Sequence, residues 1–340
     1  SSFTIDGRVR VEDLDSDHDD PGGIAFSKSG LKMYVGDDDQ SSIYEFDLVC
    51  PFNIIEGKCP PITDNKDRTA MMEAQIEIAK RTIDHSTDTA LNRLRWIRRN
   101  KDKQNLTDLN IDFNFNNQML NSLTEALKIS TSKQRKEDKK QDVFYWSEGS
   151  IAVGRIGDSS IASTKKISTD AITVGADRLT NNNGIKGLAF RVGRNDVDIG
   201  TLGSNLDTDT YNLTYYATSP IKDDTKFLDT IFGIGKLSSN ILNKLDGKNL
   251  TADRNGGQIY GMIRIKDEIK KNNLTLIPSG RFDIGHTILD NYKETGNGSI
   301  KVEKQHFRSK KIRAGLAAVE DLSNDNYTFR RHGKLEYVAD

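Results

Sequence analysis

The two cysteines are the residues whose type and spacing point most directly to a covalent bond. Cys50 and Cys59 lie in the run VCPFNIIEGKCPP, with eight residues between them and proline on the C-terminal side of each. A disulfide could close this short loop and would place it in an oxidising compartment such as the periplasm or the cell exterior. The alternative is two unrelated thiols. The short spacing and the absence of any other cysteine favour the bridge, so we expect a Cys50–Cys59 disulfide.

Patterns that could bind a metal ion are weaker. The five histidines are scattered through the chain, so the cysteines lack the two further ligands that a zinc site needs. Alternating aspartates in VEDLDSDHDDPGG resemble the opening of a calcium loop, but the later glycine and bidentate glutamate are missing at the required offsets. A solvated loop is the favoured interpretation of this run and of the aspartates at 37–39. No metal ion or other cofactor is expected.

The sequence contains no recognisable catalytic motif, and it has too little net positive charge to attract a polyanion such as nucleic acid. It contains no Ser-His-Asp pattern, phosphate-binding loop or HExxH motif, so the chain is predicted not to be an enzyme. Its 340 residues carry 49 Lys+Arg against 50 Asp+Glu, a formal net charge of −1. The basic run at 93–103 is typical of a helix C-terminus, and no nucleic-acid partner is predicted.

The elements that would position these residues change in kind along the chain. Residues 22–49 indicate three short strands, about one propeller blade or β-meander, and no second copy follows. Residues 68–99 repeat apolar side chains every three or four positions without Gly or Pro, which predicts a helix about 45 Å long. A second helix is predicted over about 116–130, and residues 132–142 form a charged loop.

From Val143 onward, apolar and polar residues alternate with a period of two. The alternation predicts about nine strands, near 143–156, 169–180, 184–199, 205–219, 226–240, 253–268, 273–288, 299–318 and 328–338. Most exceed ten residues, against a mean of about 5–6 in soluble sheets, and about ten tilted residues cross a hydrocarbon layer. Mid-strand charges at Arg191, Arg264, Arg281 and Asp283 fit a wet lumen better than a dry core. A sheet with one solvated face is the other possibility.

Four segments of this region resemble the translocator β-domain of autotransporters, the proteins of type V secretion. They are WSEGSIAVGRIGD (146–158), AITVGADRLTNNNGIKGLAFRVGRNDVDIG (171–200), LDTDTYNLTYYAT (206–218) and LTLIPSGRFDIGHTILDNYKETG (274–296). Residues 91–127 resemble the linker and pore helix that precede such a barrel, and GIAFSKSGLKMYV resembles the propeller-like repeats of some passengers. The order and spacing of the motifs carry the resemblance, which extends over nearly the whole chain from about residue 68.

The resemblance implies a mainly β fold, a transmembrane antiparallel up-and-down β-barrel preceded by α-helices and a small N-terminal β-meander. Residues 1–62 would be the end of a passenger, 63–142 a helical linker and pore helix, and 143–340 the barrel. The domain would lie in the outer membrane of a Gram-negative bacterium and would support translocation and surface anchoring of its passenger. Its partners would be outer-membrane lipid, the barrel assembly machinery and its own passenger segment.

The resemblance also assigns the two faces of the strands. The 116–130 segment would occupy the lumen, where small residues leave room for it: Gly187, Ala189, Gly193, Gly233 and Gly235. The apolar residues expected to face lipid are Leu188, Phe190, Leu213, Tyr215, Ile263, Leu276, Phe282 and Ile284.

Two features depart from the family pattern or stay open. The family's barrel has twelve strands and usually ends in an aromatic residue, whereas about nine strands are predicted here before the end at Tyr337–Asp340, so we expect an incomplete barrel or uncounted strands. Some family members cleave themselves at an Asn-Asn pair in the pore helix, and Asn116-Asn117 occupies that place. A chance pair is favoured, because the segment is rich in Asn. The alternative from another class is a soluble β-rich surface adhesin or binding protein without membrane insertion.

Overall fold

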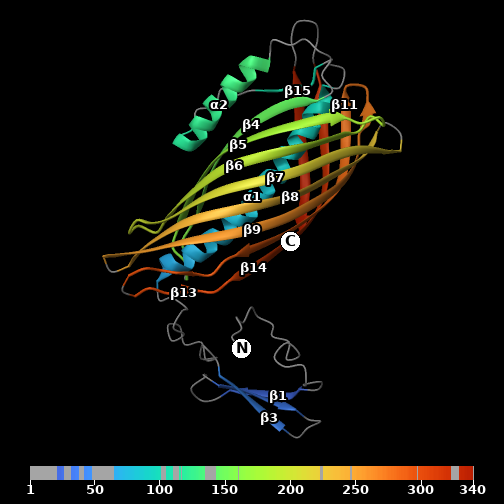
Figure 1. The fold of residues 1–340 in the computed structure, drawn as a ribbon. Coiled ribbons are helices and arrows are strands. Elements are labelled where there is room, and N and C mark those ends of the chain that lie inside the picture. Colours follow the sequence, from blue (N-terminus) through green and yellow to red (C-terminus); the bar gives the residue numbers. More distant parts are fainter. Residues whose placement is uncertain are drawn as a thin grey trace. The chain divides into compact units, whose positions relative to one another are not determined.

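The chain forms two compact units in the computed structural model, residues Ser1–Asn65 and Lys66–Asp340 (Figure 1). In the first unit the structure describes the backbone of 21–26, 32–37 and 42–47. In the second it describes 66–100, 105–109, 115, 117–134, 143–159, 161–222, 225–245, 247–296, 298–322 and 329–339, and it also describes Asn65. The first unit contains the three predicted strands, β1 (Pro21–Phe26), β2 (Lys32–Asp37) and β3 (Ser42–Asp47), paired antiparallel in that order.

Both predicted helices are present in the second unit. Helix α1 spans Lys66–Arg99 and α2 spans Gln118–Gln134. At 34 residues, α1 is about 51 Å long. Neither described helix is long and apolar enough to cross a membrane.

The second unit is built on one antiparallel sheet. Its long strands are β4 (Phe144–Ile156), β5 (Lys165–Leu179), β6 (Ile185–Ile199), β7 (Ser204–Lys222), β8 (Lys226–Leu245), β9 (Lys248–Asp267), β11 (Leu274–Leu289), β14 (Gln305–Asp321) and β15 (Arg330–Ala339). They pair in chain order from β4 to β15, as an up-and-down meander requires. The short β10 (Ile269–Lys271) pairs with β11, and β12 (Tyr292–Lys293) pairs with β13 (Lys301–Val302). All the strands predicted from the alternating pattern are confirmed within the described residues.

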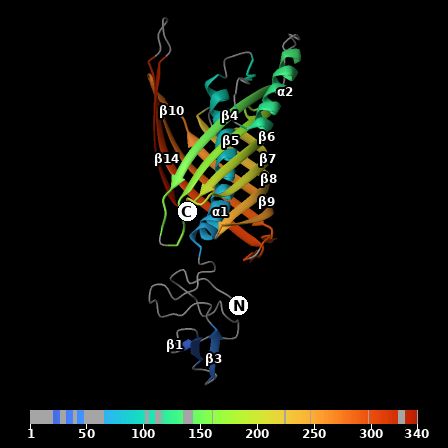
Figure 2. The same cartoon turned by 90° about the vertical axis from the view of Figure 1, so that its left-hand side faces the viewer.

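The sheet curls around α1, so that it has a concave face toward the helix and a convex face away from it (Figures 1 and 2). Successive side chains of a strand point to opposite faces, and exposed and buried residues alternate accordingly along the strands. In β6, for example, Leu188 and Phe190 are exposed on the convex face, whereas Ala189 and Arg191 are buried on the concave face. The predicted mainly β fold is confirmed.

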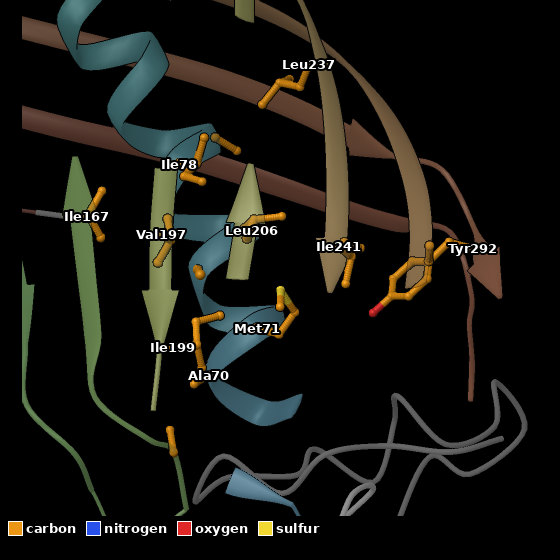
Figure 3. Packing of buried hydrophobic residues seen from close by; sticks show 14 residues of the cluster. Ala70, Met71, Ile78, Ile167, Val197, Ile199, Leu206, Leu237, Ile241 and Tyr292 are labelled. Carbon is orange, nitrogen blue, oxygen red and sulfur yellow. The ribbon is translucent and has the colours of Figure 1, made fainter. Parts of the chain in front are cut away.

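Two apolar clusters fix α1 to the concave face. The cluster near its N-terminus joins Ala70, Met71 and Ile78 to strand residues such as Val197 and Leu206 (Figure 3). The second cluster joins Leu94 and Ile97 to residues that include Trp146, Tyr216 and Met262. Alanines with almost no exposed surface at 70, 74, 79 and 90 let the helix backbone approach the strands.

The expectation that residues 116–130 occupy the lumen is wrong. Helix α1 packs against β5, β6, β7, β8, β9 and β11 on the concave face, whereas α2 packs on the convex side (Figure 2). There Leu120 of α2 lies in a cluster with Ile172 of β5 and Val192 of β6. These two side chains point away from α1, because the residues directly before and after each of them point to the concave face. The physical reason is that α1 carries both apolar and ionic groups that match the concave face, and α2 carries a short apolar stripe that fits the convex face.

Candidate functional site

The convex face is a belt of exposed apolar side chains. The residues predicted to face lipid lie on it, and seven of the eight are at least 40% exposed: Leu188, Phe190, Leu213, Tyr215, Ile263, Phe282 and Ile284. Leu276 lies on the same face near the start of β11, where it is half-buried opposite Ile269 and Ala318. Neighbouring strands add Phe232, Ile234, Ile259 and Ile312 to the belt. Such a contiguous apolar surface is what a lipid-facing barrel wall presents.

The concave face carries the opposite character, because ionised side chains are buried there in pairs. Arg93 of α1 donates two hydrogen bonds to Asp177 of β5, at 2.7 and 3.0 Å, and a third to the Leu106 carbonyl at 2.7 Å. The Tyr216 hydroxyl donates to the same carboxylate at 2.8 Å and accepts from the Trp146 indole at 2.6 Å. The buried carboxylate of Asp177 is thereby held by an arginine and a phenol together.

A second arginine of α1 is fixed one turn further along the helix. Arg98 donates to Asp229 of β8 at 3.0 Å and to the Thr218 hydroxyl at 2.8 Å. The Asp229 carboxylate, with no exposed surface, also accepts two hydrogen bonds from Arg264 of β9, at 2.6 and 2.9 Å. One buried carboxylate therefore compensates two guanidinium groups, one from the helix and one from the wall.

In the middle of α1 the sign of the helix charge is reversed. Asp84 accepts from Lys311 at 2.8 Å and from Arg313 at 3.3 Å, both on β14. Asp88 accepts from Arg281 of β11 at 2.8 Å, and Arg281 also pairs with Asp283 at 2.6 Å. The helix thus presents carboxylates to the basic strands β11 and β14 and arginines to the acidic positions on β5 and β8.

The N-terminal end of α1 is held by further polar contacts. Arg68 pairs with the buried Glu294 at 2.8 Å, and Asp67 accepts from Ser204 at 3.1 Å. Along the next turns, Arg254 donates to Gln75 at 2.7 Å and Gln258 donates to the Ala79 carbonyl at 2.7 Å. The helix is therefore fastened along its whole length.

The mid-strand charges singled out from the sequence are brought to this face. Arg191 donates to Ser150 at 3.0 Å and lies 3.4 Å from a ring nitrogen of His85. The wall residues Asp177 and Asp229 and the helix residues Asp84 and Asp88 were missed by the sequence reasoning. The sequence contained a usable signal for them. Asp177 and Asp229 are at positions of their strands that point to the concave face, and Asp84 and Asp88 are four residues apart and therefore on the same side of α1.

Two of the small residues on the concave face serve a different purpose from the one expected. A Cβ at Gly187 would overlap the Tyr216 ring and one at Gly233 would overlap the Tyr260 ring, so these glycines make room for tyrosines that lie across the wall. Among the glycines that make room for the helix is Gly285, where a Cβ would lie 2.8 Å from the Ile83 Cδ1 atom.

The segment between the two helices lies along the outer edge of the first long strand. The Asp108 amide donates to the Tyr145 carbonyl at 2.9 Å, and the Ser147 amide donates to the Asp108 carbonyl at 3.0 Å. Asn117 caps α2, since its side-chain oxygen accepts from the amides of Met119 and Leu120 at 2.9 and 3.2 Å. Asn116, Cys50 and Cys59 lie outside the described residues, so the disulfide stays a prediction and self-cleavage at Asn116-Asn117 stays the less favoured interpretation.

The described residues include no group of three or more His, Cys, Asp or Glu arranged to hold a metal ion. Both oxygens of Asp177 and of Asp229 are already used by arginine and tyrosine donors. What this arrangement can do is hold a helix against a wall, rather than transform a bound molecule.

A curled antiparallel sheet with an apolar convex face and a helix paired to its charged concave face defines the class of outer-membrane translocator barrels. The family model described as the autotransporter β-domain matches residues 145–340. The chain belongs to the autotransporter β-domain family.

Two solved structures are similar to the chain. The translocator domain of the autotransporter NalP from Neisseria meningitidis has 14% sequence identity and a TM-score of 0.45, over 65% of this chain and 90% of that chain. The β-domain of the Bordetella autotransporter BrkA has 15% identity and a TM-score of 0.47, over 58% of this chain and 80% of that chain. Among curated proteins, none matches the chain.

The family membership gives the domain its location and its task. It lies in the outer membrane of a Gram-negative bacterium, with its passenger at the cell surface, and it acts in passenger translocation. The β-domain is a secretion domain and not an enzyme. The soluble adhesin considered from the sequence is therefore set aside.

Proposed function

We propose that α1 is the tether by which this β-domain keeps its N-terminal passenger segment anchored after translocation. In this proposal residues 1–62 are the end of the passenger, 63–142 are the linker and pore-helix region, and 143–340 form the barrel. The Cys50–Cys59 disulfide closes a loop at the passenger end. The chain stays uncut at Asn116-Asn117 and acts without catalysis.

The observation that carries the proposal is the set of buried and half-buried ion pairs between α1 and the wall. Arg93 and Arg98 pair with Asp177 and Asp229 near the end of the helix, and Asp84 pairs with Lys311 in its middle. Withdrawal of the helix would remove the arginine partner of Asp177 and the Asp84 partner of Lys311, and it would leave Asp229 paired with Arg264 alone. Removing one partner of a buried pair costs about 3–5 kcal/mol, so a helix held by several such pairs resists extraction.

Protease protection on intact cells tests the tether. Protease added from outside is expected to remove residues before α1 and to leave a fragment that starts close to Lys66. In the double variant Asp177→Asn/Asp229→Asn, cleavage is expected to advance into α1. Cleavage within α1 of the unaltered chain would contradict the tether.

The intact mass of the chain from cells that have not been treated with protease tests whether the chain stays uncut. Mass spectrometry of the chain extracted from outer membranes is expected to give one species that contains both 1–62 and 143–340. A species that ends at Asn116 would show that the pair is a cleavage site and that the tether is released by chemistry.

The barrel assembly machinery is the proposed partner for insertion. Depletion of that machinery is expected to lower the amount of barrel whose migration on a gel changes on heating. Unchanged amounts of heat-modifiable barrel after depletion would exclude this partner.

A further inference from the structure

Charged residues replace the apolar belt toward one end of the convex face. Four basic side chains on β11 and β14 form what we call the basic ladder: His286, His306, Arg308 and Lys310. In the register of these strands Arg308 is opposite His286 and Lys310 is opposite Ile284. The rings of His286 and His306 are 5.7 Å apart. The ladder is thus a single patch on one face.

The ladder is exposed and is not compensated by acidic groups. His306, Arg308 and Lys310 are exposed, and His286 is half-buried. The ion pairs among the described residues include neither Arg308 nor Lys310. The next residues of the same strand, Lys311 and Arg313, point to the other face and pair with Asp84. Among the described residues, the basic side chains of β14 that form ion pairs are therefore those on the concave face.

The convex surface of β6 and β7 shows that cations on this face can be compensated when acids are nearby. Arg194 lies 3.0 Å from Asp196, 3.1 Å from Asp207 and 3.3 Å from Asp209. All four side chains lie beyond the apolar belt, as the ladder does. The same end of the wall therefore carries one arginine surrounded by three aspartates on one side and an open basic patch on the other.

The position of the basic ladder indicates which part of the membrane it contacts. The next convex residue after Lys310 is Ile312, which is 61% exposed, so the ladder begins where the apolar belt ends. The segment between β11 and β14 includes Glu294, which pairs with Arg68 at the N-terminal end of α1. That end of α1 leads toward the passenger, which is at the cell surface in this family. The ladder therefore faces the outer leaflet at the depth of its headgroups.

We infer that the basic ladder binds phosphate-bearing lipid headgroups of the outer leaflet. Arginine matches a phosphate with two parallel hydrogen bonds, and lysine adds a compact positive charge. The acyl chains of the same lipid lie against the apolar belt below the ladder, next to Ile312 and Ile284. One lipid thereby satisfies both the charged and the apolar part of this surface.

Native mass spectrometry of the full chain extracted in a neutral detergent tests the inference. Phosphatidylglycerol is the anionic probe and phosphatidylcholine, whose headgroup is neutral overall, is the reference. The unaltered chain is expected to retain phosphatidylglycerol preferentially. The double variant Arg308→Gln/Lys310→Gln is expected to lose about 25-fold in that preference, as two charges worth about fivefold each would give. Arg308→Gln alone is expected to lose about fivefold.

The matched control removes two positive charges from the same face at other strands. Lys166 and Lys236 are exposed and face outward on β5 and β8, and Lys166→Gln/Lys236→Gln is expected to leave the preference unchanged. Equal losses in both double variants would mean that only total charge matters and would overturn the inference. The same holds if the unaltered chain shows no preference, or if millimolar inorganic phosphate displaces the lipid, since the ladder would then be a site for free anions.

Discussion

The concave and convex faces of the same strands are organised by opposite rules. On the concave face charged side chains are buried and paired, as Arg93 is with Asp177 and Arg98 with Asp229. On the convex face large apolar side chains such as Phe282 and Ile263 are exposed. The comparison teaches that the wall is built inside out relative to a soluble sheet, because its apolar side faces lipid and its polar side faces a helix.

The largest effect is expected where the concave face depends on a single carboxylate. Asp229→Asn removes the one negative charge that Arg98 and Arg264 share. We expect a loss of about 3–5 kcal/mol in the free energy of unfolding, because Arg264 loses its counter-charge and Arg98 keeps only the more distant Glu268, at 3.5 Å. Urea unfolding of the refolded chain in detergent micelles measures it. Asp196→Asn, whose side chain is 55% exposed beside Arg194, is the control and should cost under about 1 kcal/mol. Similar losses in both variants would erase the distinction between the faces.

A charge placed on the convex face should have the next largest effect. Phe282→Arg puts a cation in the middle of the apolar belt and is expected to cost about 2–4 kcal/mol of folding into bilayers. Ser279→Arg, on the concave face of the same strand, should be milder because its side chain meets a polar surface. Leu276→Arg should lie between them, since Leu276 is near the strand start and half-buried. Folding yield into vesicles is the measurement, and equal yields for Phe282→Arg and Ser279→Arg would count against the face assignment.

Replacement of a glycine is expected to have a smaller effect on stability, and this effect should differ between the two faces. A Cβ at Gly233 would overlap the Tyr260 ring, whose hydroxyl hydrogen-bonds Thr214 at 2.8 Å. Gly233→Ala is therefore expected to cost about 1–3 kcal/mol through displacement of that tyrosine. Gly280→Ala points into open space on the convex face and should change stability by less than about 0.5 kcal/mol. Thermal unfolding in detergent compares the two, and an unaffected Gly233→Ala would show that Tyr260 is free to move.

The smallest expected effect concerns the helix on the convex side. Asn117→Ala removes the cap of α2 and is expected to cost about 1 kcal/mol of helix stability, seen as faster amide hydrogen exchange over Gln118–Asn121. Ser122→Ala, at an exposed position of the same helix, is the control and should leave this exchange unchanged. Identical exchange in both variants would contradict the capping role of Asn117.

Periodicity in the sequence predicted most of the elements and the face of many residues. The period-two pattern identified the long strands. The same alternation correctly assigned the side chains of Arg191, Arg264 and Arg281 to the polar face of the sheet. Local pattern suffices here, because a strand alternates its side chains whatever its partners are.

Which helix packs against the concave face could not be predicted in the same way. Helix α1 was predicted as a helix, but the family resemblance assigned the lumen to residues 116–130. The pairs that hold α1 join residues far apart in sequence, such as Asp84 with Lys311, and no local pattern reveals them. The purpose of Gly187 and Gly233 was also missed, since it depends on tyrosines of neighbouring strands. Long-range complementarity of charge and shape, rather than local pattern, decides which helix occupies the concave face.

Short-range cross-linking between α1 and the wall tests the central claim most directly. In a background with Cys50 and Cys59 replaced by serine, Ile83→Cys is combined either with Gly285→Cys, on the concave face, or with Ile284→Cys, the adjacent residue on the convex face. A short bifunctional thiol reagent is expected to join the helix position to the concave position and to leave the convex pair unlinked. Linking of the convex pair, or of neither pair, would contradict the placement of α1 on the concave face.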